Sequence, residues 1–338
     1  MTFTDDPLPL AISLMEIDST SGREGEVVAF VHRVLEERRW RVTRIGVAAG
    51  RDDVLAVGEK PPLVTLSTHL DTVPPFLPPR AEGSRLWGRG ACDAKGIAAA
   101  MICAGERLRD RGVPVGLLFV VGEEVNHDGA LAANRVPTTS KALIDGEPTE
   151  STLALGTKGG LRLVVRTRGK AAHSAYPHLG HSAIHDLVDV LQSLRSLELP
   201  VDPLLGETTV NVGVIQGGLA DNIVAPSAEA KVMIRIVSPA EDVLRTVRAR
   251  IDGRAELDEI AVIPPVRLGS VAGFPTSVVA YATDIPALTN WGTPYLFGPG
   301  SITVAHHDDE HVDIEELRAA VGRYEELVSR VLGEVRGL

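Results

Sequence analysis

Cysteine is almost absent from this 338-residue chain, which contains only Cys92 and Cys103. Two cysteines are too few for a disulfide-stapled scaffold or for a cysteine-based zinc module. If the chain binds metal ions, their ligands must therefore be residues other than cysteine.

An excess of positive charge is also lacking, because 45 acidic residues outnumber 34 basic residues and give a formal net charge of -11. This balance provides no electrostatic surface for a nucleic-acid backbone, so we expect no nucleic-acid partner. Apolar runs all fall short of the roughly 20 residues that span a bilayer. The N-terminus, MTFTDDPLPLAISLMEID, also lacks the features of a signal peptide. We therefore expect a cytoplasmic protein with no membrane partner.

The length exceeds what one compact core usually fills, so two domains are the first expectation. In the first half of the chain, apolar runs rich in β-forming residues alternate with helical patterns, which is typical of a mostly parallel sheet flanked by helices. One expected helix is entered through residues 21–23. It carries Ala29, Phe30, Val34 and Leu35 on one face. The other elements expected here are strands at 53–57, 63–68, 115–121 and 141–144, and a helix at 95–111 whose alanines and glycines permit close packing.

The pattern changes near residues 157–160. A strand at 161–167, a histidine-rich turn, a helix at 181–197, strands at 208–215 and 228–236 and a helix at 239–251 follow in order. This β-α-β-β-α order predicts a small antiparallel α+β (ferredoxin-like) unit. On the helix at 181–197, helical spacing relates Ile184, Leu187, Val188, Leu191 and Leu194. We predict catalytic segments at 1–157 and 265–338, the second closing with a helix at 313–332, and an inserted lid and dimerisation domain at 158–264.

Residue types that bind metals follow several of the predicted strands. His69 and Asp71 end the apolar run LVTLSTHLD, and the two-residue period of a strand places both side chains on the same side. A carboxylate behind a histidine fixes its tautomer, so the pair suggests a metal ligand, His69, and a residue that orients it, Asp71. For an isolated His-x-Asp, a hydrogen-bonded histidine at a strand end is the alternative.

Acidic residues that could bind a metal occupy three further segments. Asp93 lies in the glycine-rich turn at 88–96, where a helix N-cap is the alternative. Glu123 and Glu124 follow the strand at 115–121. Because neighbours on an extended chain point in opposite directions, one can bind metal while the other faces substrate, although a solvated loop start is the alternative. Glu147 follows the strand at 141–144. His69, Glu123, Glu124 and Glu147 thus lie past the carboxyl ends of strands, where open α/β sheets place their sites.

Two histidines and three carboxylates suit zinc or a similar divalent ion, and a bridging carboxylate allows two ions to lie ~3.5–4 Å apart. Three carboxylates and one hydroxide would offset the four positive charges of two such ions. The predicted ligands are His69, Asp93, Glu124, Glu147 and His306. Glu123 is left over and is the natural general base, which takes a proton from an activated water and delivers it to the leaving amine.

The motifs STHLDTVP, GRGACDAKG, GEE, GEPT, GKAAHSAYPHLGHSAI and AHHDDE occur in this order. With them the chain resembles, over essentially its whole length, the acetylornithine deacetylase, succinyl-diaminopimelate desuccinylase, aminoacylase and glutamate carboxypeptidase family of zinc hydrolases. The resemblance implies two zinc ions, with cobalt and manganese as alternatives. It places His69 and Glu147 on one ion, Glu124 and His306 on the other, and Asp93 between them.

The resemblance also implies roles for Asp71 in orienting His69, for Glu123 as the base, and for a cis peptide bond after Asp93. His306 is preferred to its neighbour His307 because it follows Ala305 and stands four residues before Glu310, as in the family motif.

Further residues are implied in the lid and near the end of the chain. In the family the lid usually forms a homodimer, and His173, in the Ala-His-Ser motif, would reach the neighbouring site and stabilise the developing oxyanion. A polar turn histidine is the alternative. Asn222 would lie near the substrate, and Arg235 would clamp its carboxylate unless it is a surface arginine. Gly300 and Ser301 would offer backbone donors to the same carboxylate.

The predicted reaction is hydrolysis of the N-acyl amide bond of a small N-acyl amino acid by a metal-activated water. N-acetylornithine or a related N-acetyl basic amino acid is the first substrate to test. A di- or aminopeptidase with the same metal pair is the alternative enzyme. A catalytically silent metal or amino-acid binder is a further alternative, against which the presence of Glu123 argues.

Overall fold

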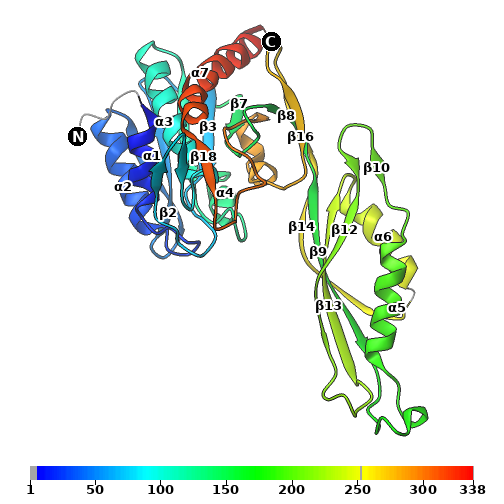
Figure 1. Cartoon of the computed structure of the whole chain (residues 1–338). Helices are drawn as coiled ribbons and strands as arrows, with labels where there is room; N and C mark the ends of the chain where they lie inside the picture. Colours follow the sequence, from blue (N-terminus) through cyan, green and yellow to red (C-terminus); the bar gives the residue numbers. More distant parts are fainter. Residues whose placement is uncertain (1–5, 252, 338) are drawn as a thin grey trace. The chain divides into compact units, whose positions relative to one another are not determined.

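The computed structural model describes residues 6–251 and 253–337 (Figure 1). The chain divides into two compact units: unit 1 comprises Met1–Leu155, Leu268–Ser277 and Thr283–Leu338, and unit 2 comprises Gly156–Arg267 and Val278–Ala282. The segment predicted as a lid, residues 158–264, lies within unit 2. Among the residues that the structure describes, no helix combines the length and the apolar character needed to cross a membrane.

Unit 1 is built on a six-stranded sheet of order β1-β2-β6-β3-β7-β17. The strands are β1 (Arg41–Ala48), β2 (Arg51–Val57), β3 (Val64–His69), β6 (Val115–Val120), β7 (Ala142–Asp145) and β17 (Thr293–Leu296). Strands β6, β3, β7 and β17 are parallel to one another, whereas β2 is antiparallel to both β6 and β1. The predicted mostly parallel sheet is confirmed.

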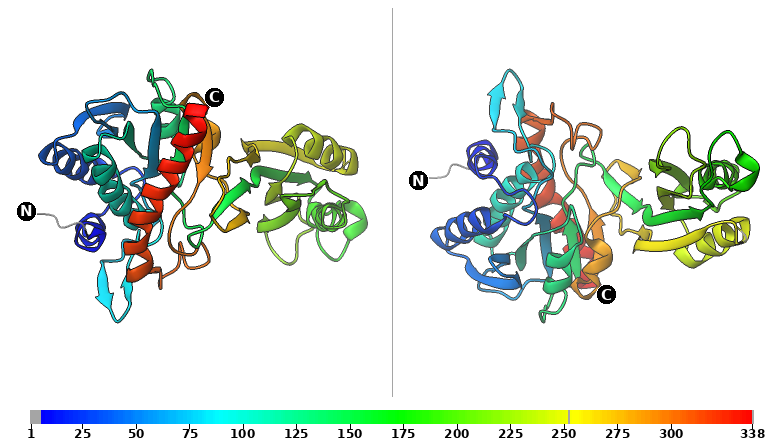
Figure 2. Two further views of the ribbon diagram at one scale, coloured as in Figure 1. Left: turned by 90° about the horizontal axis from the view of Figure 1, so that it is seen from above. Right: turned by 90° about the horizontal axis from the view of Figure 1, so that it is seen from below.

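Both faces of this sheet are covered, which explains why its inner strands read as continuous apolar runs. On β6, Leu117 and Phe119 face the larger core, and Leu118 and Val120 face a smaller core that contains Trp291. The larger core is shared with helices α1 (Pro7–Met15), α2 (Gly25–Glu37), α3 (Lys95–Asp110) and α7 (Ile314–Gly337), and α3 and α7 pack together (Figure 2). The smaller core is shared with α4 (Asp128–Ala133) and the 3-10 turns η2 (Ile285–Ala287) and η3 (Thr289–Trp291).

Helix α3 lies close to the sheet because its residues are small. A Cβ on Gly105 would come within 2.8 Å of a Leu117 methyl group, so any larger residue at this crossing would force the Leu117 side chain to shift. The close packing predicted from the alanine and glycine content of this helix is confirmed. Two further sheets have three strands each. In the first, β5 (Arg85–Trp87) pairs with β4 (Arg80–Glu82) on one side and with β18 (His311–Asp313) on the other. In the second, β8 (Leu153–Thr157) lies between β15 (Val266–Arg267) and β16 (Thr276–Val279).

Unit 2 contains a four-stranded antiparallel sheet of order β12-β13-β9-β14. Helices α5 (Ala183–Arg195) and α6 (Ala240–Ile251) share one core with this sheet (Figure 1). Its strands are β9 (Gly159–Arg168), β12 (Thr209–Gly217), β13 (Ser227–Ile236) and β14 (Glu256–Ile263). The unit also contains the 3-10 turn η1 (Pro177–Leu179) and the short pair β10 (Val201–Asp202) and β11 (Gly206–Glu207).

Two helices bury a set of residues that differs from the set related by the apolar spacing. The buried face of α2 is formed by Val27, Val28, Val31, Val34 and Leu35, whereas Ala29 and Phe30 are only half-buried. On α5, Ile184 is 37% exposed and Val188 is 52% exposed, because the helix turns a narrower stripe toward the sheet than the apolar spacing suggested.

Candidate metal centre

The carboxyl ends of β3, β6 and β7 meet at one edge of the unit 1 sheet, as parallel neighbours require. His69 is the last residue of β3, Glu123 and Glu124 follow β6, and Glu147 follows β7. The sheet therefore brings four of the predicted site residues together from segments that are far apart in the sequence.

Asp71 fixes the backbone of the acidic turn after β6. Its two carboxylate oxygens accept hydrogen bonds from the backbone amides of Glu123 at 3.1 Å and Glu124 at 3.2 Å, and the Ser21 hydroxyl donates to it at 2.7 Å. Burial opposes ionisation of Asp71, but the adjacent His69 ring and the hydrogen bond from Ser21 outweigh it and lower its pKa. The ionised carboxylate thus holds both glutamates in register with β3, a role that the sequence analysis did not anticipate.

His69 is oriented by the same segment. Its Nδ1 lies 2.9 Å from the backbone carbonyl oxygen of Asp71 and 3.6 Å from the nearer carboxylate oxygen. The closer contact is therefore with the carbonyl, whereas the sequence analysis assigned the orienting role to the Asp71 side chain. A neutral ring that donates through Nδ1 leaves the Nε2 lone pair available to a metal.

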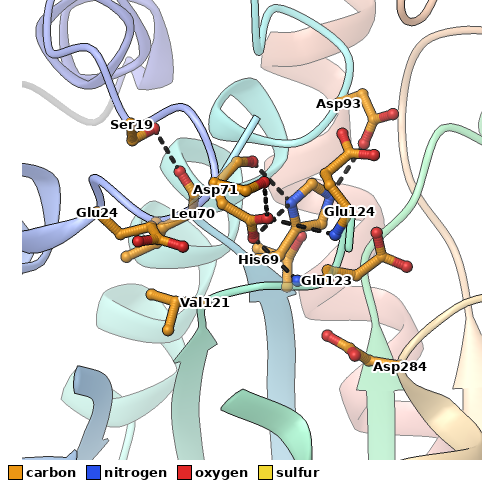
Figure 3. A network of polar contacts seen from close by, with 12 residues as sticks. Ser19, Glu24, His69, Leu70, Asp71, Asp93, Val121, Glu123, Glu124 and Asp284 are labelled. Carbon is orange, nitrogen blue, oxygen red and sulfur yellow. Dashed lines mark hydrogen bonds and ion pairs between the residues drawn. The ribbon is translucent and has the colours of Figure 1, made fainter. Parts of the chain in front are cut away.

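Asp93 lies between two histidine–glutamate pairs. Figure 3 shows Asp93 with His69 and Glu124. Its Oδ1 is 2.9 Å from His69 Nε2, which is 3.9 Å from Glu147 Oε1. Its Oδ2 is 3.3 Å from His306 Nε2, which is 3.0 Å from Glu124 Oε2. Each oxygen of the Asp93 carboxylate therefore faces a different histidine–glutamate pair.

Glu310 holds the turn that carries Asp93. Its carboxylate accepts from the backbone amides of Gly90 at 2.8 Å and Asp93 at 3.3 Å, and it pairs with Arg89 at 2.6 Å. Both charged side chains of this pair are almost completely buried. The peptide bond between Asp93 and Ala94 is cis, as the resemblance implied. Sequence analysis used Glu310 only to align the final motif and missed its contact with the turn.

The charges at this site fit bound cations. Hydrogen bonds with Asp93 and Glu124 raise the pKa of His306 to about 10, so its ring carries a proton at neutral pH when no cation competes. Burial raises the pKa of both Glu123 and Glu147 well above the usual range. Crowded carboxylates of this kind require compensating positive charge. The donor set, which contains imidazole and carboxylate groups and no thiolate, suits two zinc or similar divalent ions.

Metal binding should therefore release protons. Because its folded pKa is raised above the ordinary value, His306 holds its proton up to about pH 10, and metal affinity should rise as pH increases toward that value. At pH 7 we expect His306→Gln to release about one proton fewer per chain than the wild type. Zinc titration calorimetry in buffers of different ionisation enthalpy measures this number. Equal proton release from both proteins would contradict the assignment of His306.

His307, Gly300 and Ser301 form contacts within unit 1. His307, next to His306, is exposed, and its backbone carbonyl accepts from Arg89 at 3.2 Å. The carbonyl of Gly300 accepts from the amide of Glu150 at 2.8 Å, and the hydroxyl of Ser301 donates to the Glu150 carboxylate at 2.6 Å. The role of Gly300 and Ser301 as backbone donors to substrate stays a prediction.

Unit 2 carries the other three predicted residues in two places. His173 and Asn222 lie on adjacent loops. The amide of Ser174 donates to the Asn222 carbonyl at 2.9 Å, and His173 forms an isolated antiparallel β-bridge with Ile223. Arg235 lies near the far end of the ten-residue strand β13. Eight residues of extended chain separate Ser227, at the Asn222 end, from Arg235, which corresponds to roughly 25 Å. One small substrate cannot contact both places in a single copy of unit 2.

The chain is similar to several known proteins. Residues 155–258 match the family model of the peptidase dimerisation domain. The chain is 40% identical to a peptidase M20 domain-containing protein of Schizosaccharomyces pombe, over 96% of this chain and 84% of that protein. It is 36% identical to a probable carboxypeptidase of Aspergillus clavatus, over 96% and 82% of the two chains. Its fold is similar to that of a Staphylococcus aureus tripeptidase, with a TM-score of 0.83 and 19% identity over 97% and 98% of the chains.

Proposed function

The chain belongs to the M20 peptidase family of metal-dependent amide hydrolases, and from this premise we propose that it cleaves the amide bond that joins an acyl or peptidyl group to an amino acid with a free carboxylate. N-acyl amino acids and the C-terminal ends of short peptides share this bond. The proposal therefore includes N-acetylornithine and related N-acetyl basic amino acids, and it agrees with the name of the Aspergillus clavatus relative.

The observation that supports the proposal most strongly is the position of Asp93 between two histidine–glutamate pairs. In our proposal His69 and Glu147 hold one zinc ion, Glu124 and His306 hold the other, and Asp93 bridges the two. When bound, such ions polarise a carbonyl and make water a stronger nucleophile at neutral pH.

Glu123 is the proposed general base. It is adjacent to the ligand Glu124 but belongs to neither histidine–glutamate pair, and the Asp71 carboxylate fixes its backbone. Burial raises the pKa of Glu123 toward neutral pH, and a general base accepts and returns a proton most efficiently when its pKa is close to the working pH. Glu123 would accept a proton from the attacking water and deliver it to the leaving amine.

Recognition of the substrate carboxylate is assigned to Arg235. Burial and the neighbouring Arg162 both lower the pKa of this half-buried guanidinium, so an anion would be favourable beside it. Within residues 6–251 and 253–337, Arg235 forms no ion pair with a carboxylate. A bidentate hydrogen bond to a substrate carboxylate would compensate its charge.

We further propose a homodimer in which His173 and Asn222 act on the site of the partner subunit. The separation of these residues from Arg235 within one unit 2 supports this assignment, as does the match to a dimerisation domain. Sedimentation equilibrium of the purified protein tests the dimer, and a monomer at micromolar concentration would contradict it.

A substrate panel tests the reaction. On zinc-loaded protein we expect hydrolysis of N-acetyl amino acids and N-blocked dipeptides, and a loss in kcat/KM of roughly 10- to 100-fold when the C-terminal carboxylate is amidated, because hydrogen bonds to a charged group are lost. A strict requirement for a free amino group would instead identify a di- or aminopeptidase. Failure to turn over any member with zinc, cobalt or manganese would leave only a metal or amino-acid binder.

A further inference from the structure

His127 closes the turn that carries Glu123 and Glu124. The amides of Asn126 and His127 donate to the carbonyl of Gly122 at 3.1 and 2.8 Å, which folds the segment back on itself. His127 has a φ of 57°, in the left-handed region that side chains with a Cβ rarely adopt. Glycine would adopt this φ without strain, so the imidazole is held here at a conformational cost. Sequence analysis did not single out His127.

The His127 ring lies between two carboxylates. Its Nδ1 is 2.8 Å from Asp284 Oδ1 and 3.9 Å from Glu123 Oε1. Asp284 comes from a distant segment of unit 1, and only 3% of its side chain is exposed. The nearest ligand atoms of the three residues all lie within 4.8 Å of one another, and Figure 3 shows Asp284 and Glu123 in the same region of the site.

Two carboxylates this close repel each other when no positive group or N–H dipole separates them. Hydrogen bonding to Asp284 fixes the ring, and the ring then limits where the Glu123 carboxylate can go. We propose that His127, held by Asp284, is a positioning residue that keeps the carboxylate of Glu123 directed at the metal site. The inference rests on the proposed function in one respect, namely that Glu123 is the general base.

The backbone of the turn has its own support. Arg51 bridges the two carboxylates of Glu24 and Asp128, with contacts of 2.9 and 2.6 Å. A Cβ on Gly122 would meet Asp128 at 2.1 Å, so the turn packs directly on this bridge. The side chain of His127 is therefore separable from the folding of the turn, and removing it should leave Glu124 in place.

The test uses His127→Gly, which removes the ring and suits a left-handed φ, and His127→Asn, whose amide nitrogen can replace Nδ1 as the donor to Asp284. We expect His127→Gly to lower kcat by about 10- to 100-fold, the scale associated with misplacing a reacting group by roughly 1 Å. KM and metal content should not change, whereas the melting temperature should fall in His127→Gly, because the buried Asp284 carboxylate loses its hydrogen-bond partner. His127→Asn should recover kcat to within about threefold of wild type, because positioning depends on the retained hydrogen bond.

Arg39→Gly is the matched control, because Arg39 is an exposed residue with a φ of 64° and no part in the site. It should keep the kcat of the wild type. Crystal structures of the metal-loaded variants give a readout that needs no substrate: the Glu123 carboxylate should be displaced in His127→Gly and unmoved in His127→Asn. An unmoved Glu123 in His127→Gly would overturn the inference whether or not the substrate panel succeeds. One metal ion fewer in His127→Gly would also overturn it, because Glu123, His127 and Asp284 would then form a cation site.

Discussion

Replacement of Glu123 by glutamine is expected to lower kcat by about 10²- to 10⁴-fold, the range for loss of a general acid–base group. Glutamine keeps the shape of the side chain but cannot accept the proton of the attacking water. Because Asp71 binds the backbone amide of residue 123, the turn should stay in place and the metal content should not change. Steady-state kinetics on the best substrate of the panel, together with metal analysis, measure both quantities.

Glu325→Gln is the matched control for this substitution. The two glutamate side chains are similarly buried, with 12% of Glu123 and 14% of Glu325 exposed, but Glu325, on α7, pairs with Arg107 and Arg111 at the C-terminal end of α3. The control should retain wild-type kcat. Activity of Glu123→Gln within about tenfold of wild type would remove Glu123 from the role of general base.

Replacement of Asp93 by asparagine should have an effect at least as large, because both metal ions are assigned to this one carboxylate. We expect kcat/KM to fall on the order of 10³-fold or more, since each ion contributes several kcal/mol of charge stabilisation. An amide can bind at most weakly through its oxygen, so the protein should lose at least one of its two metal ions. Metal analysis after dialysis distinguishes this loss from a defect in chemistry alone.

Asp53→Asn provides the control for Asp93→Asn. Asp53 is fully buried on strand β2, and burial raises its pKa to about 8, so the side chain is mostly protonated at pH 7. An amide there replaces a neutral acid and keeps an acceptor for the amide of Val121. The control should keep both metal ions and most of the activity. Full metal content in Asp93→Asn would contradict the bridging assignment.

The parallel sheet and the acids at its edge could be predicted because both depend on local pattern. Continuous apolar runs identified the inner strands, and the carboxyl ends of parallel neighbours must lie together, which placed His69, Glu124 and Glu147 at one site. Two of the edge strands gave no such signal. β1 and β14 are largely exposed and rich in polar residues, so sequence analysis missed both.

The contacts that orient the site could not be read from the sequence. Asp71 binds amides about 50 positions away, and Glu310 binds a turn more than 200 positions away. Single residues at such separations carry no periodic pattern, and only the folded chain brings them together. The same reason explains why His127 and Asp284 were not singled out.

The most direct test of the account is a crystal structure of the zinc-loaded protein with anomalous diffraction measured at the zinc absorption edge. We predict two peaks that share Asp93, one bounded by His69 and Glu147 and the other by Glu124 and His306. A single peak, or two peaks that do not share Asp93, would contradict the dinuclear centre.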